Sequence, residues 1–148
     1  MNSLLFSSLY DNETFYNVFA RDLHNAKKNV IIESPFITTK RMKALMPVLR
    51  RLRQKGVQVV VNTRDPVEHD ADYAAQAFQA IAKMQEIGAV VLYTVKHHRK
   101  LAIIDNEILW EGSLNILSQN DSCEIMRRSV SEELANEMVR FIGLNQYM

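Results

Sequence analysis

The sequence is poor in cysteine, with Cys123 as the only thiol among 148 residues. One thiol excludes an internal disulfide and a cysteine-rich zinc site. Proteins without disulfides are typical of reducing compartments, so we expect a cytoplasmic protein. Its stability must come from a hydrophobic core, and 148 residues suffice to bury one in a single domain spanning residues 1–148.

Long apolar runs and an excess of one charge are also absent. No run of about 18 apolar residues could span a bilayer, and the start MNSLLFSSLYDN lacks the basic and apolar stretches of a secretory signal. We therefore expect neither export nor a membrane partner. The formal net charge is +1, so attraction for a polyanion would have to come from local basic clusters.

Two patterns of apolar residues alternate over the first two thirds of the chain, one typical of buried strands and the other of helices. Continuous β-branched runs predict buried strands at 29–36, 57–63 and 89–95. Apolar residues at helical spacing predict helices within 11–28, from 40 to 55 and from about 73 to 87. Pro47 removes a backbone donor inside the second helix, where we expect a kink or a late start. The alternation is typical of an α/β layered sheet.

The last third of the chain has a different pattern. Two antiparallel strands, a short third strand and a closing helix are predicted at RKLAIID (99–105), EILWEGS (107–113), SCEIMRRS (122–129) and about 131–142. Asp105 and Asn106 should form the tight turn between the first two strands. The predicted fold class is α/β, with a mixed, mostly parallel central sheet and helices on both faces.

Polar residues of complementary chemistry gather around the predicted hairpin. Side chains alternate along a strand, so His98 and Lys100 should project together, while Arg99 and Asp105 point to the other side. The returning strand would bring a small residue, a hydroxyl and an amide close to the histidine, at Gly112, Ser113 and Asn115. A base, a cation, a hydroxyl and an amide are then expected to converge.

Such a group can split a phosphodiester without a metal. The reaction needs a nucleophile able to form a transient covalent bond, donors and positive charge on the non-bridging oxygens, and an acid for the leaving oxygen. His98 can attack phosphorus, and Lys100, Ser113 and Asn115 can hold the oxygens. No His, Asp and Glu cluster has convincing ligand spacing, so we expect neither a metal nor a cofactor.

The spacing of these residues resembles the motif His-x-Lys-x4-Asp-x6-Gly-Ser-x-Asn of the phospholipase D superfamily, and every position is filled. The resemblance implies the phospholipase D-like fold and a phosphohistidine intermediate on His98. It also implies a downstream glutamate that accepts a hydrogen bond from the other imidazole nitrogen, a role that falls to Glu124. Asp105 belongs to the motif, but it should face away from the phosphate, so we give it a structural part.

Enzymes of this superfamily use two such motifs, and the sequence contains one. The segments HNAKK at 24 and HDADY at 69 both fail to match. The resemblance therefore implies a symmetric homodimer in which His98 faces its twin across a two-fold axis. Two histidines in one phosphate pocket titrate as a coupled pair, so we expect the best activity on the mildly acidic side of neutral.

Residues near the motif are open to functional or structural interpretations. Arg127 and Arg128, soon after the glutamate, and Arg99 inside the motif are candidates for binding the substrate. The basic segment KRMKALMPVLRRLRQK is more typical of the solvated face of a helix than of a phosphate track. We expect His97 at a turn or on the surface.

The roles of two further residues are left open. Trp110 is expected in the core or a dimer contact rather than stacked on a base. Glu33, at the end of a predicted strand, could line a cleft or cap a turn.

The leading hypothesis is a metal-independent nuclease that forms a homodimer and cleaves nucleic acid, DNA rather than RNA. The resemblance is to phospholipase D-like nuclease domains found alone or appended to helicase-type and restriction proteins. The first alternative is a DNA-binding module of a larger helicase or ATPase that grips phosphates without cleaving them. The second is a phospholipid hydrolase or transferase, which should show an apolar membrane-facing segment that the sequence lacks.

Overall fold

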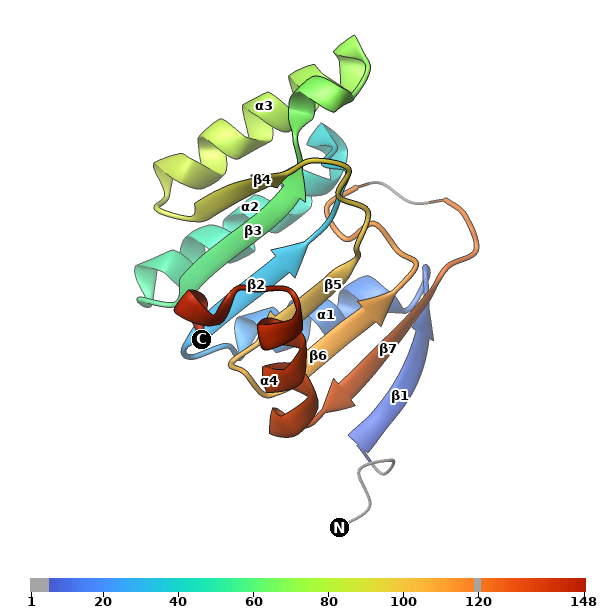
Figure 1. Cartoon of the computed structure of the whole chain (residues 1–148), viewed down its shortest axis with the longest axis vertical. Coiled ribbons are helices and arrows are strands. Elements are labelled where there is room, and N and C mark those ends of the chain that lie inside the picture. The colour runs from blue at the N-terminus through green and yellow to red at the C-terminus, as the bar shows by residue number, and fades with distance from the viewer. Residues whose placement is uncertain (1–5, 119–120) are drawn as a thin grey trace.

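The computed structural model describes residues 6–118 and 121–148, and its strands form one mixed sheet (Figure 1). The strands are β1 Ser7–Asp11, β2 Asn29–Glu33, β3 Gln58–Arg64, β4 Val90–Thr94, β5 Leu101–Ile104, β6 Ile108–Gly112 and β7 Ile125–Val130. They lie side by side in the order β1-β7-β6-β5-β2-β3-β4. The first strand was not predicted, because its sequence SSLYD contains no β-branched residue.

Helices cover both faces of this sheet (Figure 1). They are α1 Phe15–His24, α2 Thr39–Gln54, α3 Ala71–Glu86 and α4 Glu132–Phe141, with short 3-10 turns at η2 Pro66–Glu68 and η3 Asn145–Tyr147. The larger hydrophobic cluster joins the sheet to α1, α2 and α3, and the smaller one lies beneath α4. Helix α2 continues through Pro47. The α/β class with helices on both faces is confirmed.

Within the described residues, none of the helices combines the length and apolar character needed to cross a membrane.

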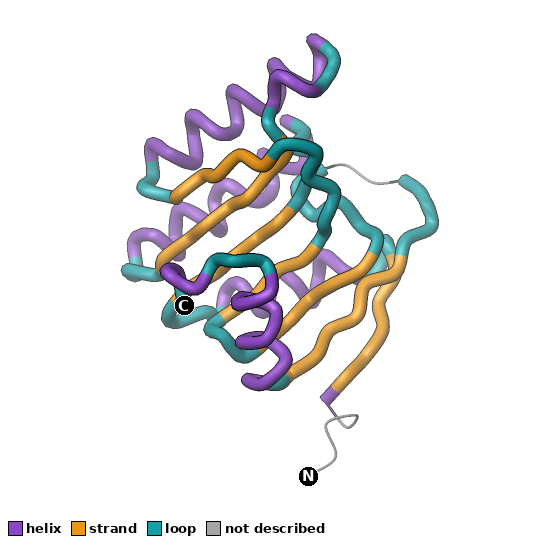
Figure 2. The backbone as a smooth tube through the Cα atoms, viewed as in Figure 1, coloured by secondary structure: helices purple, strands orange, loops and turns teal. Residues whose placement is uncertain are grey.

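The directions of the strands place many connections on one edge of the sheet. The strands β2, β3 and β4 run parallel, whereas the other four pairs are antiparallel, so the expectation of mostly parallel pairing holds only for this part. The chain therefore leaves β2, β3, β4 and β6, and enters β5 and β7, at the same edge. We call it the motif edge, and Figure 2 shows its loops gathered there.

Trp110 on β6 lies in the larger core, as expected. Its side chain is fully buried and packs edge-to-face on Phe15 of α1, with ring centroids 4.9 Å apart. Its indole N–H donates a hydrogen bond of 2.8 Å to the carboxylate of Asp22. These contacts tie the hairpin strand β6 to α1.

Asp105 holds the opposite end of β5. Asp105 and Asn106 have φ of 57° and 52°, the left-handed pair that a type I′ turn requires. The carboxylate accepts hydrogen bonds from the backbone N–H groups of Lys27, Lys28 and Asn29, the shortest 2.7 Å long. It thereby fixes the hairpin to the start of β2.

Asp105 belongs to the motif, but the structure places it far from His98 and outside the catalytic group. His98 precedes β5 and Asp105 follows it, so at about 3.3 Å per residue roughly 15 Å or more separate the two. The carboxylate therefore has the structural part that its expected direction indicated.

We predict that Asp105→Asn lowers the free energy of unfolding by about 1–3 kcal/mol, because one amide oxygen replaces a charged acceptor of three backbone N–H groups. Asparagine tolerates the left-handed backbone, so the turn itself is retained. Urea denaturation measures the change. Glu107→Gln, the same substitution at an exposed position two residues away, is the control and should stay within about 0.5 kcal/mol of the wild type. Equal stability of both variants would contradict the assigned role.

Candidate active site

The His-x-Lys residues lie in a loop at the motif edge rather than in a strand. Strand β5 begins only at Leu101, and residues 97–100 have no regular secondary structure. The prediction of a strand starting at Arg99 was therefore wrong by two residues. His98 is exposed and Lys100 is half-buried, so an anion arriving from solvent can reach the imidazole directly.

His98 and Lys100 contact each other closely. The Lys100 ammonium nitrogen lies 3.1 Å from Nδ1 of His98 and donates a hydrogen bond of 2.8 Å to the His98 carbonyl. Partial burial lowers the pKa of Lys100, against the opposing effect of the Glu124 charge. A cation with a lowered pKa therefore stands beside an accessible imidazole.

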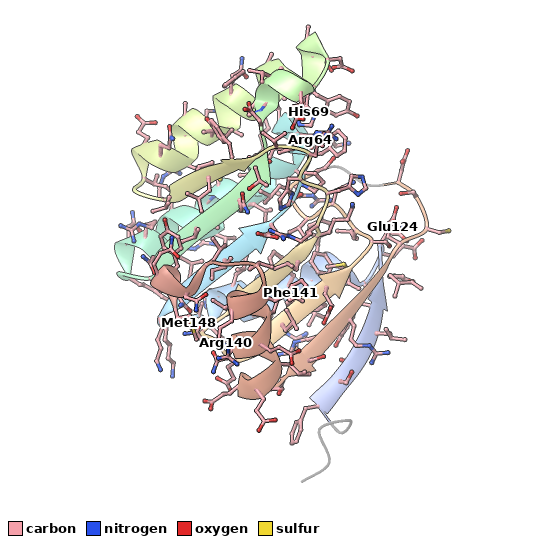
Figure 3. The ribbon with its side chains drawn as sticks, in the orientation of Figure 1. Arg64, His69, Glu124, Arg140, Phe141 and Met148 are labelled. Carbon is pink, nitrogen blue, oxygen red and sulfur yellow. The ribbon has the colours of Figure 1, made fainter. Side chains whose placement is uncertain are left out.

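Glu124 also lies at the motif edge, on the segment that leads into β7 (Figure 3). Hydrogen bonds from Ser113 and Ser122 lower its pKa, helped by the charge of Lys100. The bond from the Ser122 hydroxyl is 2.5 Å long. Its carboxylate is therefore hydrogen-bonded to the two serines and influenced by the charge of Lys100, and the hydrogen bond to His98 that the resemblance implies stays a prediction.

The glycine and serine of the motif connect β6 to β7. A Cβ atom on Gly112 would lie 2.0 Å from the carbonyl oxygen of Ile125, so only glycine fits. Ser113 donates its backbone N–H to that carbonyl over 2.9 Å, and its hydroxyl accepts from the Ile125 N–H at 3.0 Å. This close approach holds Ser113 beside Glu124.

Asn115 lies two residues further along the same loop. Its backbone carbonyl accepts from Ser118 N at 3.0 Å, and the hydroxyl of Tyr16 donates to the neighbouring Ile116 carbonyl over 2.8 Å. The guanidinium of Arg41 stacks on the Tyr16 ring, 3.5 Å from its centre. Helices α1 and α2 therefore support the loop that carries Asn115.

Beneath the loop lies a buried carboxylate whose role the sequence left open. Glu33 is fully buried at the end of β2. Arg99 donates to it from Nε over 2.6 Å and from a terminal nitrogen over 3.1 Å, and Nε2 of His97 lies 3.2 Å away. Burial raises the pKa of Glu33, but its contacts with His97, Arg99 and Asn62 outweigh burial and leave the pKa below its usual value.

His97 closes a turn with Thr94, as one of its two expected positions had it, but its side chain is buried at 3% exposure rather than on the surface. The signal in the sequence was a glutamate at the end of the buried run NVIIE, because a buried carboxylate needs charged or hydrogen-bonding partners. The positions of residues along the sequence do not identify these partners.

The three arginines predicted to bind substrate have different surroundings. Arg128 forms two 2.8 Å hydrogen bonds with Asp22 of α1, and Arg99 is paired with Glu33. Both guanidinium groups are engaged by carboxylates of this chain, which argues against their use for substrate. Arg127 is exposed and contacts the Ser7 hydroxyl at 2.5 Å, so its predicted role is the one we retain.

Among residues 6–118 and 121–148, no cluster of three or more His, Cys, Asp or Glu side chains could hold a metal ion.

Comparisons with known proteins place these features in a family context. The family model described as "Cardiolipin synthase, PLD-like domain" matches residues 19–142. No curated protein sequence matches the chain.

Solved structures resemble the chain at low identity. Nuc of Salmonella typhimurium, described as a phospholipase D family member, is 17% identical, with 91% of each chain covered and a TM-score of 0.72. NucT of Helicobacter pylori is 16% identical, over 95% of this chain and 94% of that one, with a TM-score of 0.71. The archaeal chromatin protein TrmBL2, described by its mode of DNA binding, is 11% identical, over 95% of this chain and 51% of that one, with a TM-score of 0.63. At these identities the structures show a shared fold.

Proposed function

The chain belongs to the phospholipase D-like family, whose model spans residues 19–142, and we propose that it is a metal-independent phosphodiesterase that cleaves nucleic acid. One observation carries the proposal: an exposed imidazole, His98, has an ammonium group 3.1 Å away, and the charge of the Glu124 carboxylate acts on that ammonium. A nucleophile and a cation are two of the groups that phosphodiester cleavage without a metal requires, and a carboxylate can orient the nucleophilic imidazole. The third requirement, an acid for the leaving oxygen, falls to a second imidazole.

The first step that we propose is a change of partner by Lys100. In the free protein its ammonium faces Nδ1 of His98, and a nitrogen that accepts this hydrogen bond carries no proton. Attack by Nε2 needs the proton on Nδ1, because Nε2 must offer its lone pair. A phosphate anion would draw the Lys100 ammonium to its own oxygens. Nδ1 would then take a proton from water while Nε2 releases its proton to water, and the new Nδ1–H could donate to Glu124.

The second step is nucleophilic attack. Nε2 of His98 forms a bond to phosphorus, the bond to the leaving oxygen breaks, and a second imidazolium donates its proton to that oxygen. Lys100, Ser113 and Asn115 would stabilise the negative charge on the non-bridging oxygens. Water, deprotonated by the second imidazole, then attacks phosphorus, and the P–N bond to His98 breaks, which restores both histidines.

The second imidazole has to come from another chain. The sequence has four histidines. His97 is buried against Glu33, His69 lies 3.1 Å from the Pro35 carbonyl and stacks on Phe36, and His24 ends α1. None of these three stands beside His98 as a proton donor. We therefore propose a homodimer in which two His98 residues share one site.

Nucleic acid is favoured as the substrate over lipid by the short chain, its single motif and its local basic clusters. The coverage of Nuc and NucT over more than 90% of their chains supports a small enzyme of the same kind. The similarity to TrmBL2 gives some support to a rival, a module that binds DNA without cleavage. The filled motif favours cleavage.

We predict that the protein cleaves DNA in the presence of EDTA and that His98→Ala lowers the rate at least about 1000-fold, because the nucleophile is lost. Rapid quenching with a phosphate-labelled oligonucleotide should leave acid-labile label on the wild-type chain and none on His98→Ala. His24→Ala is the matched control, since it removes an imidazole outside the site. Binding of DNA with no cleavage by either protein would favour the rival module.

We predict that the protein is a dimer in sedimentation experiments and that two His98 residues serve each site. Wild type and His98→Ala are unfolded together in equal amounts and refolded, so that about one quarter of the dimers contain two wild-type chains. Activity divided by the total amount of chain should then be about one quarter of the wild-type value, because only dimers with two imidazoles turn over. A remainder of about one half would mean that each chain has its own complete site.

We predict a pH profile of kcat/KM with its maximum on the mildly acidic side of neutral, because one His98 must be neutral and the other protonated. Burial lowers the pKa of Lys100, so its ammonium loses its proton at a lower pH than that of an ordinary lysine. The alkaline slope of log kcat/KM should therefore steepen from about −1 to about −2, and Lys100→Arg should keep it near −1. A rate that rises steadily through about pH 10 would contradict the coupled pair.

A further inference from the structure

The loop that carries His98 has few backbone restraints. Among the described residues, the backbone hydrogen bonds at its two ends are long, 3.3 Å from His97 N to Thr94 O and 3.4 Å from Gly112 N to Lys100 O. Lys96, just before it, has a left-handed φ of 59°, so the chain changes direction as it enters the loop. Side chains must therefore contribute to holding residues 97–100 in place.

Alternate side chains of this loop point in opposite directions. His97 and Arg99 turn toward the sheet and both meet the carboxylate of Glu33. Lys100 contacts His98 on the other side, where the imidazole is exposed. One buried carboxylate thus holds the residue before the nucleophile and the residue after it.

Glu33 is itself held from two further strands. Asn62 of β3 donates to Oε2 of Glu33 over 2.8 Å. Thr94 of β4 donates to Oδ1 of Asn62, also over 2.8 Å. The chain of hydrogen bonds fixes the amide so that its N–H₂ faces the carboxylate, and the carboxylate has little freedom to follow the loop if the loop moves.

We propose that Glu33 is a positioning residue for the reaction: by holding His97 and Arg99 it orients the loop so that His98 and Lys100 face the phosphate together. The catalytic part of this inference rests on the proposed function. A displacement of about 1 Å in a nucleophile is enough to reduce a rate by about 100-fold.

The chain contains a matched control for a buried carboxylate paired with an arginine. Asp22 is 6% exposed, pairs with Arg128 and accepts from Trp110. It lies on α1, beneath β6 and β7, and has no contact with residues 97–100. Asp22→Asn and Glu33→Gln thus remove equivalent charges, and only the second lies under the loop.

The experiment compares the full chain with these two variants. Urea denaturation gives their stability, and kcat and KM are measured on an oligonucleotide in EDTA. Imidazole ¹⁵N resonances, assigned with His98→Ala, report the environment of the His98 ring without reference to activity. The last measurement separates the inference from the proposed function, since it is informative even for a protein that does not cleave.

We expect Glu33→Gln to lower kcat by about 10- to 100-fold with KM within about threefold, because binding groups remain while the nucleophile is misplaced. The His98 ring resonances should shift in Glu33→Gln and remain at their wild-type positions in Asp22→Asn. Unchanged His98 resonances in folded Glu33→Gln would overturn the inference, whatever the activity. Absence of cleavage by the wild type would instead overturn the proposed function.

A second pair of variants decides the question if Glu33→Gln does not fold. Nε2 of His97 lies 3.2 Å from Oε1 of Glu33. The amide nitrogen of glutamine can take the place of Nε2, so His97→Gln keeps a polar nitrogen beside Glu33 whereas His97→Ala removes it. We expect His97→Ala to shift the His98 resonances and His97→Gln to leave them close to those of the wild type. Equal spectra for the two variants would show that His97 only fills space and would overturn the inference.

Discussion

The burial of one carboxylate is the constraint around which the motif edge is organised. An ionised glutamate without water has to be compensated by hydrogen bonds and positive charge. Glu33 receives both, from an amide on β3 and from an imidazole and a guanidinium on the loop before β5. The need to pair this charge therefore couples the parallel part of the sheet to the segment that carries His98.

The antiparallel half of the sheet contributes the remaining chemistry. The β6–β7 connection approaches so closely at Gly112 that a serine hydroxyl and a glutamate come to stand across from the lysine. The two halves of the sheet thus deliver different groups to one edge. A single chain still provides one accessible imidazole there, which is why the proposed chemistry requires a second copy.

The sequence was informative where the relevant contacts are local. The left-handed turn at Asp105 and the alternation of strand and helix follow from a few adjacent residues, and the structure contains both. The sequence was a poor guide to pairing between distant residues. Arg128 looked like a substrate ligand, but its partner Asp22 is 106 positions away. His97 looked like a surface residue for the same reason, since its partner lies on another strand.

The tight contact at Gly112 shows that the residues of one motif are constrained for two different reasons. Gly112 and Asp105 are required by packing and by a turn, whereas His98 and Lys100 have no comparable part in the architecture. Any relative that kept this shape without the proposed catalysis would be free to lose the histidine and lysine but not the glycine and aspartate. Remnants of the motif in such a lineage would then record ancestry rather than enzymatic capacity.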